Sequence, residues 1–184
     1  MKIRKYDQTE SEWVEKIRDS DAQAFEHLFK AYCQPLINFA RRFVRDVQIA
    51  ENIVQDVFLK IWTNRIKLNP SLNIKTYLFT AVRNQTLNHL RHAKMEKDSV
   101  ADLQLIATPV KTPENGWKEK ELATSIQQAI NELPKKCQTI FLMNRYDQLT
   151  YQEIADILNL SIKTVETQMG RALKFLRKRL SHFI

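Results

Sequence analysis

The sequence predicts an all-α protein of two small helical domains joined by a flexible linker, with a helix-turn-helix in the C-terminal domain. Apolar residues recur with the 3.6-residue period of amphipathic helices along most of the chain, whereas alternating apolar–polar runs are absent. This period stops between residues 95 and 118, where two Thr-Pro steps disfavour helix. Residues 150–180 show the caps and spacing of two helices around a tight turn.

These breaks divide the chain into a first domain (1–94), a linker (95–118) and a second domain (119–184). Counting Lys and Arg against Asp and Glu gives net charges of +6, −1 and +3 for the three parts, which make up the overall +8. Both predicted domains are therefore basic and the linker is not. A basic protein with a pI near 9.5 is typical of one that binds a polyanion such as nucleic acid.

Composition also excludes several classes of protein. The only glycines are Gly116 and Gly170, too few for a P-loop or a Rossmann phosphate turn, so we expect no enzyme and no nucleotide cofactor. His89 and His92 lie three residues apart on one predicted helix, but no nearby Cys, Asp or Glu completes a metal site, so no metal is predicted. Cys33 and Cys137 are expected to be reduced thiols.

Membrane insertion is not expected either. No apolar run approaches the roughly 20 residues that span a bilayer, and the N-terminus MKIRKYDQ lacks the apolar segment of a signal peptide. We therefore expect a cytoplasmic protein.

The first predicted helix covers residues 10–19, with Trp13, Val14 and Ile17 on one side. Asp21 is the expected cap of a second helix, which Pro35 should kink or interrupt because proline lacks a backbone donor. The inward positions of this second helix, on both sides of the proline, are Phe25, Leu28, Phe29, Tyr32, Leu36, Phe39, Ala40 and Phe43, with Arg41, Arg42 and Arg45 expected outside.

A third helix is predicted from Asp46 to Trp62, with a wide apolar face. Its opposite face is mixed and mostly acidic, and it contains Glu51, Gln55, Asp56 and Lys60. From residues alone, this face is equally well read as a solvated helix surface.

Residues 63–94 contain no acid, although six basic residues occur there. Residues 64–74 are predicted to form a loop around Asn69-Pro70-Ser71, and residues 75–92 another helix. Cations interleaved with aromatic and amide side chains suit single-stranded nucleic acid. The cations neutralise phosphates, the aromatic rings stack on bases and the amides hydrogen-bond to bases. The alternative is that Tyr77 and Phe79 belong to the core and the cations are merely solvated.

The second domain opens with an apolar stripe from Leu122 to Leu133, and Pro134 starts its next helix. Thr150 and Glu153 then form a capping box, Asn159 suits a left-handed turn, and Ser161 suits the cap of a final helix. On that helix Val165, Met169, Ala172, Leu173, Leu176 and Leu180 form one stripe.

Polar and basic residues lie away from this stripe, and they are free to read base edges. They are Lys163, Thr164, Thr167, Gln168 and Arg171. An ordinary helical hairpin is the alternative, but from residue 161 onward six basic residues accompany a single acid, Glu166, which favours DNA.

Together these stretches resemble a bacterial RNA polymerase sigma factor of the extracytoplasmic-function group of the sigma-70 family. AENIVQDVFLKIW is similar to the family's core-polymerase-binding helix, and TYLFTAVRNQTLNHLR to its promoter-melting and minus-10-reading helix. LTYQEIADILNLSIKTVETQMGRALKFLR is similar to its minus-35-reading helix-turn-helix, and ELPKKCQTIFLMNRYDQLT to the helix and turn before it. The resemblance covers nearly the whole chain.

The resemblance implies an alternative sigma factor that directs promoter-specific initiation and needs no cofactor. It implies three sets of site residues: Glu51, Gln55 and Asp56 toward the clamp helices of the polymerase β′ subunit; Asn64, Lys67, Asn69, Lys75, Tyr77, Arg83 and Asn84 for melted minus-10 DNA; and Ser161, Lys163, Thr164, Thr167, Gln168 and Arg171 for minus-35 duplex. The first helices of the second domain would contact the β flap. An anti-sigma factor is a further implied partner.

Some positions depart from the family pattern. Asn52 stands where an acid is frequent, Tyr77 where tryptophan is, and Asn159 where glycine is. The rival function is a free-standing dimeric helix-turn-helix regulator with an N-terminal sensing domain, which would bind a palindrome. A sensing domain gives no reason for an acid-free stretch at residues 63–94. Promoter sequence, regulon, inducing signal and the identity of an anti-sigma factor do not follow from these residues.

Overall fold

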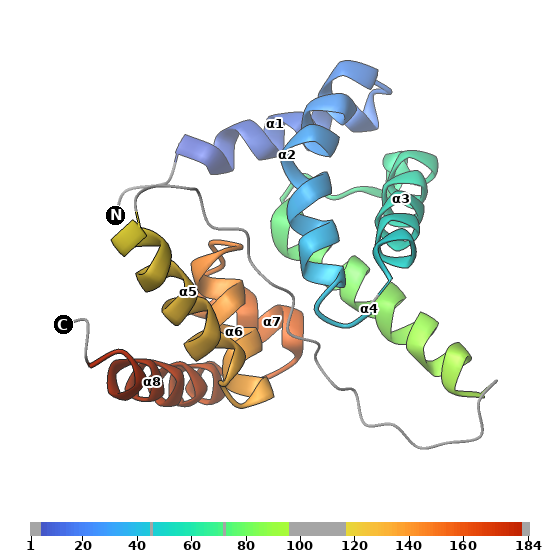
Figure 1. The fold of residues 1–184 in the computed structure, drawn as a ribbon. Coiled ribbons are helices and arrows are strands. Elements are labelled where there is room, and N and C mark those ends of the chain that lie inside the picture. The colour runs from blue at the N-terminus through green and yellow to red at the C-terminus, as the bar shows by residue number, and fades with distance from the viewer. Residues whose placement is uncertain (1–4, 45, 72, 96–116, 182–184) are drawn as a thin grey trace. The chain divides into compact units, whose positions relative to one another are not determined.

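The computed structural model describes residues 5–44, 46–71, 73–95 and 117–181, and within them every regular element is a helix (Figure 1). The chain divides into two compact units, Met1–Asp102 and Leu103–Ile184. Most of the predicted linker lies outside the described residues. At its two ends, one helix ends at Met95 and the next helix begins at Trp117. Within the described residues no helix is long and apolar enough to cross a membrane.

The first unit is built around its second helix. It contains α1 (Lys5–Arg18), α2 (Ala22–Ala40), α3 (Val47–Thr63), the short 3-10 helix η1 (Arg65–Lys67) and α4 (Ile74–Met95). Helix α2 packs against α1, α3 and α4, and it buries Leu28, Leu36 and Phe39 completely. Asp21 caps it as predicted, because its carboxylate accepts hydrogen bonds from the backbone N–H groups of Gln23 and Ala24.

Helix α2 runs through Pro35 without interruption, so the break that we allowed for does not occur. Proline removes one backbone donor inside a helix, but here three neighbouring helices hold both halves in place. The expectation that Arg42 lies outside is also wrong. Its side chain is only 6% exposed, and its guanidinium carbon lies 5.7 Å from the ring centroid of Phe39. An aromatic face accepts a cation, so this arginine belongs to the packed unit.

Aromatic rings fill the space between the helices of the first unit. Phe25 and Phe29 of α2 contact Phe58 of α3, with ring centroids 6.1 and 4.9 Å apart. Phe39 contacts Phe79 of α4 at 5.1 Å, and Phe79 is 1% exposed. Phe79 therefore belongs to the hydrophobic core, as the alternative interpretation of the sequence had it, and it is unavailable for stacking on a base. Tyr77 does not belong to the core, since it is 42% exposed.

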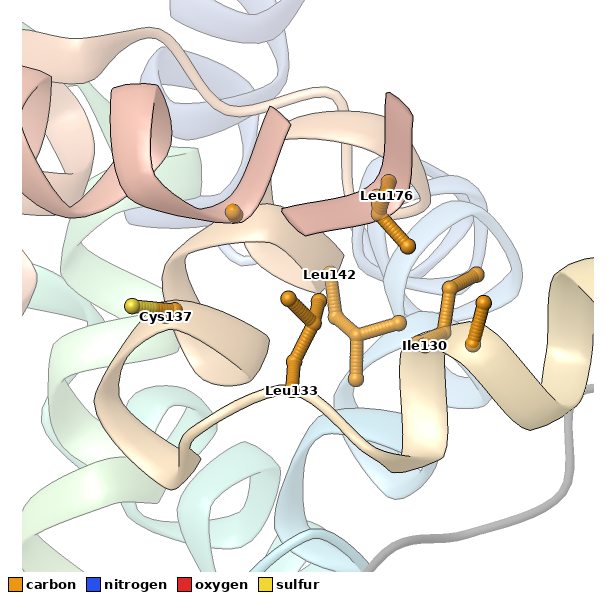
Figure 2. Close-up of a cluster of buried hydrophobic side chains, with 7 residues drawn as sticks. Ile130, Leu133, Cys137, Leu142 and Leu176 are labelled. Carbon is orange, nitrogen blue, oxygen red and sulfur yellow. The ribbon is translucent and has the colours of Figure 1, made fainter. Parts of the chain in front are cut away.

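The second unit contains α5 (Trp117–Asn131), α6 (Lys135–Arg145), α7 (Tyr151–Leu158) and α8 (Ile162–Arg179). Helix α8 packs against the other three. Its inward residues meet those of α5 and α6 in one apolar cluster, shown in Figure 2: Ala129, Ile130, Leu133, Cys137, Leu142, Ala172 and Leu176. This cluster fixes the axis of α8 relative to the rest of the unit, so that its other face is turned outward.

Candidate nucleic-acid interface

The turn between α7 and α8 has the predicted local chemistry. Thr150 and Glu153 form a reciprocal capping box at the start of α7. Asn159 ends α7 in the left-handed conformation, with φ 55° and ψ 52°. Ser161 then caps α8, accepting a hydrogen bond from the Thr164 N–H at 3.1 Å. These side chains fix where α8 starts and how it leaves the turn, which is the geometry of a helix-turn-helix.

Helix α8 has one buried and one exposed face. Val165, Met169, Ala172 and Leu176 are buried as predicted. Leu173 is not, since it is 39% exposed. It lies one residue, or about 100°, from Ala172, which places it on the flank of the helix. Phe175, on the other flank, packs against the cluster instead.

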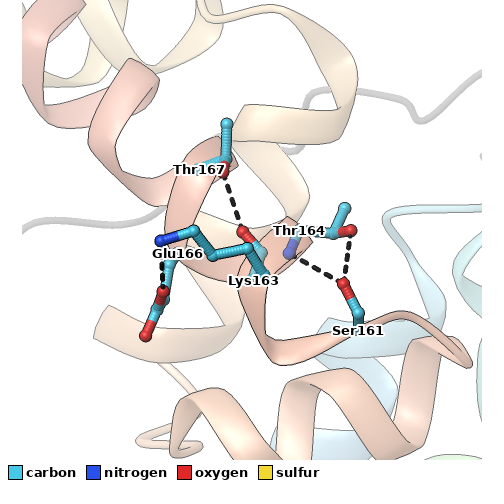
Figure 3. A network of polar contacts seen from close by, with 5 residues as sticks. All are labelled: Ser161, Lys163, Thr164, Glu166 and Thr167. Carbon is cyan, nitrogen blue, oxygen red and sulfur yellow. Dashed lines mark hydrogen bonds and ion pairs between the residues drawn. The ribbon is translucent and has the colours of Figure 1, made fainter.

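Most polar residues of the predicted minus-35 face bond within α8 itself, as Figure 3 shows. The hydroxyls of Ser161 and Thr164 lie 2.8 Å apart, and the Thr167 hydroxyl donates to the Lys163 carbonyl. The Lys163 ammonium lies 3.4 Å from the Glu166 carboxylate, and both side chains are largely exposed. Such an exposed pair is weak, so it leaves Lys163 available to a phosphate.

Arg171 and Gln168 differ from these residues. Arg171 is exposed and makes no hydrogen bond or ion pair with any described part of the chain. Gln168 is half-buried, and its amide oxygen accepts a hydrogen bond from the Cys137 thiol of α6 at 3.1 Å. The face thus combines one free guanidinium with an amide that a neighbouring helix holds.

The loop at residues 64–74 is tied to its surroundings at several points, which the sequence did not indicate. Arg65 donates to the Ser20 hydroxyl and the Trp62 carbonyl, both at 2.9 Å, and its guanidinium carbon lies 4.8 Å from the Trp62 ring centroid. The Ser11 hydroxyl donates to the Pro70 carbonyl at 3.2 Å. Arg65 therefore braces the loop, and it is not a free cation of the acid-free stretch.

Within this loop the predicted site residues fall into two groups. Asn64 caps α3 and donates to the Lys60 carbonyl, and Asn69 accepts from the Ser71 N–H. Both side chains thus also hold the backbone. Lys67 is exposed and has no hydrogen bond or ion pair from its side chain among the described residues. The exposed Ile66, at 74%, was not singled out from the sequence.

On α4, Tyr77 and Asn84 share one exposed face because they lie seven residues, or about two turns, apart. Asn88 and Arg91 continue this face. Arg83 is half-buried on its flank and donates to the Asn84 amide oxygen at 3.3 Å. Lys75 is half-buried and lies two residues, or about 160° round the helix, from Tyr77, so it is not on this face. The helix therefore presents a ring, amides and cations along one side, while Leu78, Phe79 and Val82 are buried on the other.

The predicted polymerase-binding residues lie on the outward side of α3. Gln55 and Asp56 are exposed, whereas Glu51 is half-buried. Burial raises the pKa of the Cys33 thiol of α2, and the negative charge of Glu51 raises it further. Glu51 thus lies toward α2. Leu59, missed in the sequence, is 63% exposed beside Gln55 and Asp56, and its position outside the apolar stripe was the signal that could have revealed it.

A groove of about 440 Å³ lies between α3 and α4. Its walls include Asp56 on α3 and both His89 and His92 on α4. Among the described residues, no group of three or more His, Cys, Asp or Glu side chains is arranged to hold a metal ion. Among the described residues, the groove therefore offers no set of side chains that would bind a metal ion.

Comparisons with known proteins agree with this arrangement. The family model for sigma-70 region 2 matches residues 28–95, and that for sigma-70 region 4 matches residues 123–176. The ECF RNA polymerase sigma factor SigW of Bacillus subtilis is 28% identical over 178 residues, which cover 91% of this chain and 94% of that protein. The RNA polymerase sigma-H factor of Pseudomonas aeruginosa is 24% identical, with 91% of each chain covered.

Two solved structures share the fold. CnrH, in complex with the cytosolic domain of CnrY, has a TM-score of 0.64 at 18% identity, covering 95% of this chain and 98% of that one. The sigma factor RpoE of Bartonella quintana, in complex with the anti-sigma factor NepR, has a TM-score of 0.63 at 21% identity, covering 87% and 98%. With both regions matched in order, the chain belongs to the sigma-70 family of RNA polymerase sigma factors, in its extracytoplasmic-function group.

Proposed function

We propose that the chain binds core RNA polymerase and brings two DNA-reading surfaces to a promoter, α8 for minus-35 duplex and the residues 64–84 for melted minus-10 DNA. The observation that carries this proposal is the exposed face of α8, where the uncommitted Arg171 lies beside Gln168 and Lys163 on a helix whose other face is buried. A helix mounted in this way presents side chains to the edges of bases in a major groove.

Opening of the promoter is assigned to the first unit. The loop at residues 64–74 is rigidly braced by Arg65 yet exposes Lys67, and α4 exposes the Tyr77 ring next to it in sequence. An unstacked base costs a few kcal/mol to extrude, whereas stacking on an aromatic ring returns about 1–3 kcal/mol per base. A preformed loop with a ring and cations therefore traps bases that the polymerase has helped to separate.

Core polymerase is the proposed partner of α3. Gln55, Asp56 and the exposed Leu59 lie on one side of this helix, which gives a surface of one amide, one carboxylate and one apolar side chain. We assign this side to the β′ clamp helices and the first helices of the second unit to the β flap. Since the Bartonella quintana sigma factor with this fold was solved with an anti-sigma factor, we propose an anti-sigma factor as the regulator of this chain.

The test separates the two functions of the chain. Arg171→Ala should lower transcription from a minus-35-dependent promoter by about ten-fold or more, since a bidentate base contact is worth about 1–3 kcal/mol. It should leave binding to core polymerase unchanged, as measured by competition with a labelled copy of the wild-type chain. Asp56→Ala is the matched control, expected to weaken core binding instead. Loss of core binding in Arg171→Ala would refute the assignment of faces.

A further inference from the structure

One contact in the second unit joins the apolar core to the proposed DNA face. The Cys137 thiol of α6 lies 3.1 Å from the Gln168 amide oxygen of α8. Cys137 belongs to the buried cluster and is 3% exposed. Figure 2 shows its sulfur pointing away from the leucines of that cluster. The sulfur thus lies between the buried cluster and the half-buried side chain of Gln168.

The chemistry of the thiol decides the direction of this hydrogen bond. Burial raises the pKa of the Cys137 thiol, against a smaller lowering by the positive charge of Arg171 and by a backbone hydrogen bond. The thiol therefore keeps its proton at neutral pH and donates it. Of the two polar atoms in the Gln168 amide, only the oxygen accepts, so the oxygen faces Cys137 and the nitrogen faces outward.

The outward nitrogen has no hydrogen-bond partner in any described segment. With its oxygen turned toward Cys137, the Gln168 amide directs its N–H donors away from α6, beside the guanidinium of Arg171, which only donates. Glutamine reads adenine through two bonds, one accepted by its oxygen and one donated by its nitrogen. Guanine instead offers two neighbouring acceptors, N7 and O6, to a donor.

We propose that Cys137 is a positioning residue that turns the Gln168 amide into a donor toward the major groove, so that guanine is favoured over adenine at the base pair Gln168 reads. This inference rests on the proposed function of α8 as the minus-35 reader. It adds a residue outside that helix to the determinants of promoter choice.

The experiment uses the full chain assembled with core polymerase on templates whose upstream element is randomised, with transcripts sequenced to give the preference at each base pair. Gln168→Ala first identifies the base pair, as the one where preference disappears. Cys137→Ala should then lower the guanine-to-adenine ratio there by about two- to ten-fold, the range of one net hydrogen bond. Other positions should keep their preferences.

Cys137→Ser is the matched control, because it loses the same sulfur packing but keeps an O–H donor, and it should retain the guanine preference. Thermal unfolding of both variants checks that they are equally folded. A ratio that Cys137→Ala leaves unchanged, or a loss shared equally by Cys137→Ser, would overturn this inference alone. If the wild-type chain shows no upstream preference, or Gln168→Ala removes none, the minus-35 assignment fails as well.

Discussion

At the scale of single residues, the described side chains divide into those that bond within the protein and those left for a partner. Arg65 and Arg171 are both basic residues in positively charged segments, yet Arg65 has two hydrogen bonds and a ring contact, while Arg171 has no bonded partner in the described chain. A positively charged segment therefore contains both cations that bond within the protein and cations whose side chains make no such bond in the described residues. Long-range contacts decide which is which.

Gly170 provides a test at this scale. It lies inside α8, and a Cβ built there meets nothing within 4 Å. Because glycine in a helix interior is less favourable than alanine, Gly170→Ala should raise the free energy of unfolding by about 0.5–1 kcal/mol. Urea denaturation followed by circular dichroism measures this change. Ala172→Gly, at a buried position of the same helix, should have the opposite sign, and a destabilised Gly170→Ala would contradict the open surroundings described here.

The predictable residues were those whose environment is local. The caps Asp21, Thr150 and Ser161 and the left-handed Asn159 were each identified from neighbours within four positions, because capping bonds span only a few residues. Arg42 was misplaced, although its contact with the Phe39 ring spans only three residues. Its charge and its place among other arginines favoured an exposed position, and the sequence pattern does not show that it packs over a buried ring.

At the scale of elements, the braced loop at residues 64–74 shows the same limit. The sequence indicated a loop and its basic character, but the Arg65–Ser20 bond joins residues 45 positions apart. Periodicity cannot reveal such a pair. The interleaving of aromatics in α4 was likewise predicted, but the division between a buried Phe79 and an exposed Tyr77 follows from contact with Phe39 of α2.

Arg65 and Lys67 form a matched pair at this scale. Arg65→Ala should lower the free energy of unfolding by about 1–2 kcal/mol, because two hydrogen bonds from a charged group are lost. Promoter opening should fall with it, as measured by permanganate reactivity of melted thymines. Lys67→Ala should impair opening without changing stability, since its side chain has no bonded partner among the described residues. Equal stability of Arg65→Ala and the wild type would contradict the bracing role.

At the scale of the whole molecule, the two units have separate cores and each carries one proposed DNA surface. A single helix-turn-helix offers a small interface, so selective binding should require both surfaces on one polymerase. The match of region 2 to residues 28–95 also removes the rival function, since it leaves no sensing domain there.

This arrangement predicts how binding depends on polymerase and salt. The free chain should bind duplex DNA weakly and without sequence preference in gel shifts, whereas the holoenzyme should select its promoter. Binding should weaken steeply with salt, because phosphate contacts release counterions, and removing one contacting cation such as Lys163 should reduce the logarithmic salt slope by about one. Tight binding of the free chain to a palindrome as a dimer would contradict the sigma-factor mechanism.

The caps of α7 and α8 have a consequence for folding kinetics. Thr150 with Glu153, and Ser161 with Thr164, each bond across three residues, and Asn144 holds the preceding turn through the Leu149 carbonyl at 2.8 Å. Contacts of such short sequence separation close with little loss of chain entropy, and helical units rich in them fold in about microseconds to milliseconds. We therefore expect the second unit to refold in about microseconds to milliseconds after dilution from denaturant, as stopped-flow or temperature-jump fluorescence would measure.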